Sequence, residues 1–74
     1  MTKFSISQQI EEIEREITLR ERVYPNQVRT GAMRQSVADY HMNRIKAAKA
    51  SLEWLRANET AVRAFVSKQK DAAA

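Results

Sequence analysis

The sequence contains no cysteine, and only one histidine, one proline and one glycine among its 74 residues. Without cysteine, neither a disulfide nor a thiolate metal site can stabilise the fold, and this usage suits the reducing cytoplasm. A chain of this length forms one domain at most, whose hydrophobic core contributes about 3–5 kcal/mol of net stability. We therefore expect a small cytoplasmic protein that gains further stability by associating with a second copy.

Other absences narrow the kind of function. No apolar run approaches the roughly 20 residues that cross a bilayer, and the N-terminus lacks the apolar stretch of a signal peptide. The sequence has no glycine-rich phosphate loop, no zinc-ligand spacing and no Glu-x-x-His pattern of a two-metal helical bundle. We predict a protein that is not an enzyme and holds neither cofactor nor metal, and whose glutamates form a solvated face.

The single proline and the single glycine lie close together and divide the chain. Pro25 lacks a backbone N–H and disfavours a helical Tyr24, while Gly31 can adopt a positive φ. The pattern predicts a first helix over about 6–23 and a bend over 24–33, in which a single helical turn can run from Pro25 to Thr30 and stop at Gly31. Four apolar side chains are expected to close this end of a helical hairpin: Val23, Tyr24, Val28 and Met33.

The first helix has a clear start and a narrow apolar seam. Ser5 and Gln8 form a capping-box pattern, which predicts that the helix begins at Ile6. Four isoleucines follow with spacings of 4, 3 and 4 residues, which places them on one side of the helix: Ile6, Ile10, Ile13 and Ile17. A seam of this coiled-coil type needs a partner helix.

The second helix, predicted over about 34–57 with Ser36 as a candidate cap, carries two apolar rows. The first row should face the isoleucine seam and includes a half-buried histidine: Ala38, His41, Ile45, Ala48, Leu52 and Leu55. The second row runs along a neighbouring side: Tyr40, Ala47, Ala50, Trp54, Ala57 and Ala61. Two rows imply two neighbours, so the second row predicts a homodimer with four packed helices and Trp54 as an anchor.

The C-terminal segment allows three interpretations. A weak break near Asn58 favours a separate helical segment over about 59–69, with an apolar face of Val62, Phe65 and Val66. The second helix can also continue without a break, or the segment can fold back to cover Trp54. Residues 70–74 lack an apolar face and are expected to fray, and the terminal alanines can be cloning residues. The predicted fold is all-α, a single domain over 1–74 built on an antiparallel helical hairpin.

The formal net charge of +4 is unevenly distributed. Residues 1–19 carry a net charge of −2, residues 20–37 carry +3 and the remainder carries +3. Interleaved charges are typical of a solvated face, although a basic bend also fits phosphate or an acidic protein surface. The bend exceeds the 3–4 residues of a helix-turn-helix motif, and the matching seams predict nearly antiparallel helices, so direct nucleic-acid binding is the less favoured interpretation.

The bend and its flanks carry a spaced set of residues around an Arg-Val-Tyr-Pro core: Leu19, Arg20, Arg22, Val23, Tyr24, Pro25, Val28, Gly31, Met33, Ala38 and Asp39. This set resembles a pattern found in small, mostly uncharacterised phage- and prophage-encoded proteins. The similarity covers residues 16–45, and Arg34 departs from it, since related sequences often have a capping threonine or serine there. The resemblance implies a helical hairpin of phage origin and carries no known activity.

A short phage-type protein without a catalytic site commonly acts by occupying a surface of a host macromolecule. Our hypothesis is a protein that binds and modulates a host protein, such as a defence or regulatory component, in the bacterial cytoplasm. The alternatives are a nucleic-acid-binding accessory protein that uses the basic bend, and a structural subunit of a phage assembly. The candidate partner-binding residues are Arg20, Arg22, Arg29 and Arg34 for an acidic surface, and Trp54, Phe65 and Val66 for apolar contact. Trp54 and Phe65 can instead complete a dimer core.

Overall fold

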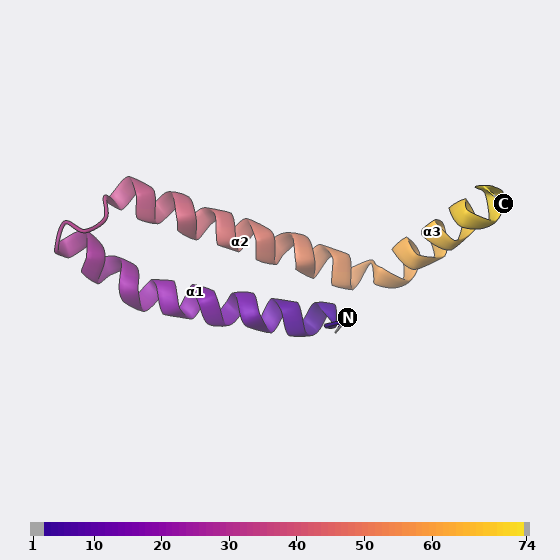
Figure 1. The fold of residues 1–74 in the computed structure, drawn as a ribbon, viewed down its shortest axis with the longest axis horizontal. Coiled ribbons are helices and arrows are strands. Elements are labelled where there is room, and N and C mark those ends of the chain that lie inside the picture. Colours follow the sequence, from indigo (N-terminus) through magenta and orange to yellow (C-terminus); the bar gives the residue numbers. More distant parts are fainter. Residues whose placement is uncertain (1–2, 74) are drawn as a thin grey trace.

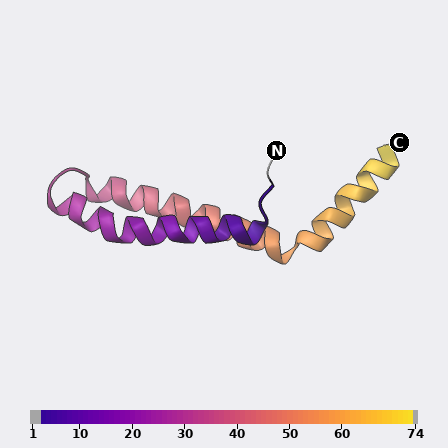
Figure 2. The same cartoon turned by 60° about the horizontal axis from the view of Figure 1, so that its bottom comes forward.

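A computed structural model describes residues 3–73. These residues form three helices: α1 (Ile6–Arg29), α2 (Gln35–Ala57) and α3 (Glu59–Ala73). Figures 1 and 2 show α1 and α2 side by side as an antiparallel hairpin, while α3 projects beyond its open end. The molecule is elongated, with principal extents of 59 × 23 × 22 Å. The expected all-helical fold, with the first two helices packed together, is confirmed.

The start of α1 is the predicted capping box. The Ser5 side chain accepts a hydrogen bond from the Gln8 backbone N–H at 3.1 Å, and the Gln8 side chain accepts one from the Ser5 N–H at 2.9 Å. This arrangement satisfies two backbone donors that a helix start otherwise leaves without partners. It therefore fixes Ile6 as the first residue of α1.

The core of the hairpin is thin and follows the isoleucine seam. Ile10, Ile17 and Ala38 are the buried apolar residues in the described part of the chain, and Ile10 is only 1% exposed. Ile6 and Ile13 are half-buried, because two helices alone cannot enclose a whole side chain at every level. The predicted seam on α1 is thus confirmed, and the hairpin depends on very few fully buried groups.

The prediction that Pro25 ends the first helix is wrong, since α1 continues to Arg29 and the bend shortens to residues 30–34. Pro25 removes the N–H that would bond to the Glu21 carbonyl, but both residues are exposed, so water can bind that carbonyl. The extra turns bring Tyr24 and Val28 into a groove beside α2, where both are half-buried. The contact with α2 offsets the cost of the proline.

Gly31, which was predicted to stop a separate helical turn after Pro25, instead follows the end of α1 itself. Thr30 is the C-cap, and Gly31 follows with a φ of 82°. The Gly31 N–H bonds to the Val28 carbonyl and the Met33 N–H bonds to the Gln27 carbonyl, both at 3.1 Å. These bonds satisfy carbonyls at the helix end while the positive φ turns the chain toward α2.

Replacing Gly31 with alanine is expected to lower the free energy of unfolding by about 1 kcal/mol. Nothing lies within 4 Å of the position that an added Cβ would take, so the cost comes from the positive φ alone. Gly31→Asn should cost less, because asparagine tolerates this conformation. Urea denaturation followed by circular dichroism measures both values, and an equal loss for the two variants would contradict this origin of the cost.

The seam on α2 differs from the prediction by a small rotation of the helix. His41 and Ala48 were expected to face α1, but both are exposed, and Met42 and Lys49 are half-buried instead. Flexible methionine and the aliphatic part of lysine can cover the isoleucines while the ammonium group reaches water. The remaining members of the predicted row are buried or half-buried: Ala38, Ile45, Leu52 and Leu55.

The start of α2 also differs slightly from the prediction, which had Ser36 as the candidate cap. The N-cap is Arg34, which makes no side-chain capping bond, and Ser36 lies in the first turn rather than at the cap. The Arg34 carbonyl accepts the first backbone bonds from Val37 and Ala38 at 3.1 and 3.0 Å. This helix start therefore lacks the side-chain bonds that fix α1.

The predicted break at Asn58 is confirmed. Asn58 caps α2 by donating from its side chain to the Trp54 carbonyl at 2.8 Å, and its own carbonyl accepts the Val62 N–H at 2.9 Å. The helix that follows does not fold back, and Trp54 remains exposed. It also runs past the predicted end at residue 69 to Ala73, so residues 70–73 are helical, while Ala74 lies outside the described residues.

Candidate protein-binding surfaces

The structure separates the candidate residues into two groups at opposite ends of the hairpin. The arginines lie along the second half of α1 and at the bend, whereas Trp54, Phe65 and Val66 lie at the open end and on α3. Arg34 and Trp54 are 20 residues apart along α2, or about 30 Å at 1.5 Å per residue. The two groups therefore form separate surfaces.

Arg20 differs from the other arginines because it makes contacts within the chain. Its Nε donates to Glu16 Oε1 at 2.9 Å, and its Nη1 donates to the His41 backbone carbonyl at 3.0 Å. Its guanidinium carbon lies 5.9 Å from the ring centroid of Tyr24. Arg20 thus joins α1 to α2, and its half-buried side chain is a hairpin contact rather than an open charge.

The other three candidate arginines are exposed: Arg22, Arg29 and Arg34. Within residues 3–73, ion pairs join only Arg20 to Glu16 and Arg63 to Glu59. The Arg29 side chain donates to Asn26 Oδ1, a neutral acceptor that leaves its charge uncompensated. The C-terminal part of α1 and the bend therefore present positive charge that is accessible to an acidic group, and we call these three residues the basic end.

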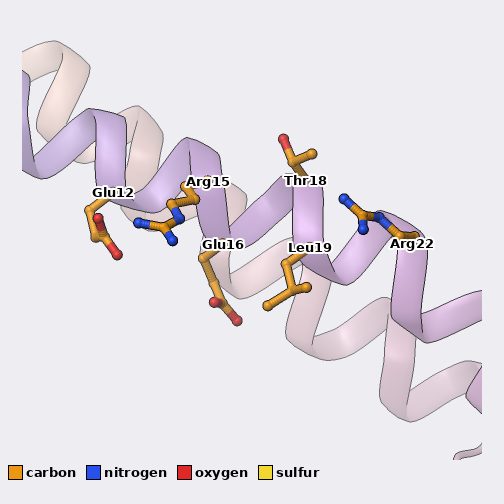
Figure 3. A pocket seen from close by; sticks show the side chains of 6 residues that line it. All are labelled: Glu12, Arg15, Glu16, Thr18, Leu19 and Arg22. Carbon is orange, nitrogen blue, oxygen red and sulfur yellow. The ribbon is translucent and has the colours of Figure 1, made fainter.

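The outer side of α1 has alternating charge around one exposed leucine. Figure 3 shows that the side chains lining a surface hollow here all come from α1, with the charged groups spread along the helix. Leu19 lies among them and is 48% exposed. Because a single helix supplies every lining residue, the hollow is an open strip of surface and encloses no ligand. The residues are Glu12, Arg15, Glu16, Thr18, Leu19 and Arg22.

The apolar candidates are strongly exposed. Trp54 is 62% exposed, and Phe65 and Val66 are 63% and 47% exposed. Val62 belongs to the same predicted face of α3 but is half-buried, because it lies in a hollow with Ile6 and Leu55 at the open end of the hairpin. The first turn of α3 thus rests on the hairpin, and the apolar face beyond it is open. We call Phe65 and Val66 the α3 face.

Sequence reasoning missed two polar features of the hairpin. It did not identify the contact between Arg20 and the His41 carbonyl, which depends on how α1 packs on α2. It also missed Arg44, whose guanidinium carbon lies 5.2 Å from the ring centroid of Tyr40 and whose Nη1 lies 3.1 Å from the Tyr40 hydroxyl. The four-residue spacing of Tyr40 and Arg44 was the available signal for this second contact.

The described residues contain no group of three or more histidine, cysteine, aspartate or glutamate side chains placed to hold a metal ion. His41 lies edge-on to Tyr40, with ring centroids 5.4 Å apart. None of the described helices is both long enough and apolar enough to traverse a bilayer.

Comparison with known proteins gave no match. No protein-family model fits the chain, and neither a curated protein nor a solved structure is significantly similar to it. The surfaces described above are therefore the basis for assigning a function.

Proposed function

We propose that this chain is a non-catalytic protein of the phage or prophage type that binds and modulates a host protein in the bacterial cytoplasm. The observation that carries the proposal is the α3 face. Exposed aromatic side chains are the groups that most often anchor protein interfaces, because they bury a large area with few rotatable bonds. Phe65 and Val66 offer such an anchor on a helix that extends away from the hairpin.

The charges around the α3 face support a partner with both apolar and acidic surface. Lys68 and Lys70 follow Phe65 and Val66 within the next two turns, and both are exposed. An apolar centre with a charged rim is the usual organisation of an interface. We propose that the α3 face enters an apolar groove of the partner. Lys68 and Lys70 then attract acidic groups beside this groove, and the basic end attracts acidic groups further away.

A second part of the proposal is that the protein acts as a homodimer. The row that begins at Tyr40 lies on α2 away from α1, and its members on α2 are all exposed in one copy. A helix of this kind is stable when a neighbour covers its apolar side. A dimer through α2 leaves the α3 face of each copy available for the host protein.

Nucleic-acid binding through the basic end is a second candidate function. Arg22, Arg29 and Arg34 are exposed and make no ion pair within the described residues, which is what phosphate contacts require. An interaction of that kind weakens steeply with salt through counterion release, whereas binding through the α3 face should not.

Phe65→Ala is expected to reduce retention of the host partner at least tenfold, because it removes the largest exposed side chain of the α3 face. Ser67→Ala is the matched control, since Ser67 is exposed on the same helix but lies outside the apolar face. The measurement is affinity capture from bacterial lysate with the wild-type chain and each variant as bait. Equal retention by the two variants would remove the α3 face from the proposal.

A further inference from the structure

The outer side of α2 repeats with a period of seven residues. Tyr40, Ala47 and Trp54 form one row and Asn43, Ala50 and Ala57 form the adjacent row, and all six residues are exposed. Seven residues are close to two helical turns, so both rows share one side of α2. We call these six residues the α2 outer face.

We infer that the α2 outer face binds the same face of a second copy in antiparallel orientation, with Ala47 against the partner's Ala50. This inference rests on the homodimer of the proposed function and specifies its orientation and register. In a dimer with two-fold symmetry, both copies use the same surface, and each contact between two residues occurs twice. This surface must therefore be complementary to itself.

The sizes of the side chains are complementary in this register. Placing Ala47 against the partner's Ala50 also places Tyr40 against the partner's Ala57 and Trp54 against the partner's Asn43. Every layer then pairs a large residue with a smaller one, or two alanines, so the helices can approach closely. A parallel pair would instead place Trp54 against Trp54 and Ala47 against Ala47. The two tryptophans would hold the helices apart, and the two alanines would then leave a gap between them.

The charges beside the α2 outer face are complementary as well. Lys46 and Glu53 are exposed, lie seven residues apart and therefore share one flank of this face. Neither makes an ion pair among the residues that the structure describes. In the antiparallel register, Lys46 of each copy lies near the partner's Glu53, which gives two equivalent pairs across the interface.

The chain's own third helix leaves the α2 outer face uncovered. Figures 1 and 2 show α3 projecting beyond the hairpin instead of lying along α2, and Trp54 is left exposed. On the other flank, Arg44 lies over the Tyr40 ring, which orients this aromatic side chain at the edge of the face. A second copy of α2 is therefore the neighbour that matches the shape and charge of the face.

Cysteine substitution tests the orientation directly, because the chain has no cysteine of its own. The double variant Ala47→Cys/Ala50→Cys should form disulfide-linked dimers with a mild oxidant, since the two positions face each other within the roughly 7 Å between Cα atoms that a disulfide spans. Ala57→Cys alone should not cross-link, because antiparallel copies hold these residues about 25 Å apart. Efficient linking at Ala57, as in a parallel pair, would overturn the inference.

The face itself has a matched control. Ala48 is exposed next to Ala47 but lies about 100° further around the helix, so Ala48→Cys should not cross-link. Linking at Ala48 equal to that of the double variant would overturn the inferred face. A chain that remains monomeric by light scattering would also overturn it, together with the proposed homodimer, while retention of a host protein by that monomer would leave the proposed host-protein binding intact.

Charge exchange tests the register independently of oxidation. Lys46→Glu and Glu53→Lys should each weaken self-association about tenfold in sedimentation equilibrium, because each places like charges together twice. The double variant Lys46→Glu/Glu53→Lys should return to within about twofold of the wild type. Lys70→Glu on α3 is the control and should have no effect. Failure of the double variant to restore association would contradict the pairing of Lys46 with Glu53.

Discussion

Ile10→Ala is expected to unfold most of the hairpin at ordinary temperatures. Ile10 is the most deeply buried side chain that the structure describes, at 1% exposure, and it belongs to the isoleucine seam of α1. Replacing a buried isoleucine with alanine costs about 2–5 kcal/mol. A core of this size supplies about 3–5 kcal/mol in total, so a single substitution removes most of the stability.

Leu19→Ala is the matched control, because Leu19 is an aliphatic residue on the same helix that lies on its outer side. Its substitution should change the free energy of unfolding by no more than about 0.5 kcal/mol. Circular dichroism during urea denaturation, at one fixed protein concentration, gives both values. Similar losses for Ile10→Ala and Leu19→Ala would show that the isoleucine seam is not the core.

Trp54→Glu is expected to convert the dimer to monomers. In the inferred interface Trp54 fills the space beside the partner's Asn43, so the variant loses an aromatic anchor and places a carboxylate in each half of the contact. Central tryptophans of interfaces commonly contribute 2 kcal/mol or more. We expect the dissociation constant to rise roughly hundredfold, which corresponds to about 2.8 kcal/mol.

Phe65→Glu provides the comparison, since Phe65 is as exposed as Trp54 but lies on α3. This substitution should leave the dimer unchanged and abolish retention of the host protein, whereas Trp54→Glu should do the reverse. Multi-angle light scattering over a range of concentrations distinguishes dimers from monomers for both variants. Dimers that persist in Trp54→Glu would refute the placement of the second copy on the α2 outer face.

Features set by neighbouring residues could be predicted from the sequence. The capping box of Ser5 and Gln8 needs only residues that are three positions apart, and it placed the start of α1 correctly. The isoleucine spacing identified the buried side of α1, and Asn58 marked the end of α2. Gly31 was correctly expected to stop a helical segment, because its positive φ is unfavourable for residues that carry a Cβ, although the segment that it stops is α1 and not a separate turn.

Features set by packing between the helices could not be predicted in the same way. Pro25 should break an isolated helix, but the half-buried Tyr24 and Val28 hold the chain helical beside α2. The rotation of α2 follows from how Met42 and Lys49 cover the isoleucines, which spacing alone does not reveal. Both errors arise because local propensity is weaker than tertiary contact.

The candidate site was predictable to a similar degree. Strongly apolar residues in a row that lacks a partner could be identified from spacing, and Trp54, Phe65 and Val66 are exposed as a binding role requires. Which arginines remain accessible depends on tertiary contacts. Arg20 and Arg22 are only two residues apart on α1, yet the hydrogen bond from Arg20 to the His41 carbonyl of α2 makes Arg20 part of the hairpin while Arg22 stays exposed.

The most direct test of host-protein binding is affinity capture from bacterial lysate with the wild-type chain, carried out in parallel with and without nuclease. We expect one host protein to remain bound after nuclease treatment and in high salt, because the α3 face provides an apolar anchor. Retained material that disappears with nuclease would contradict host-protein binding and would assign the basic end, and with it the function, to nucleic acid.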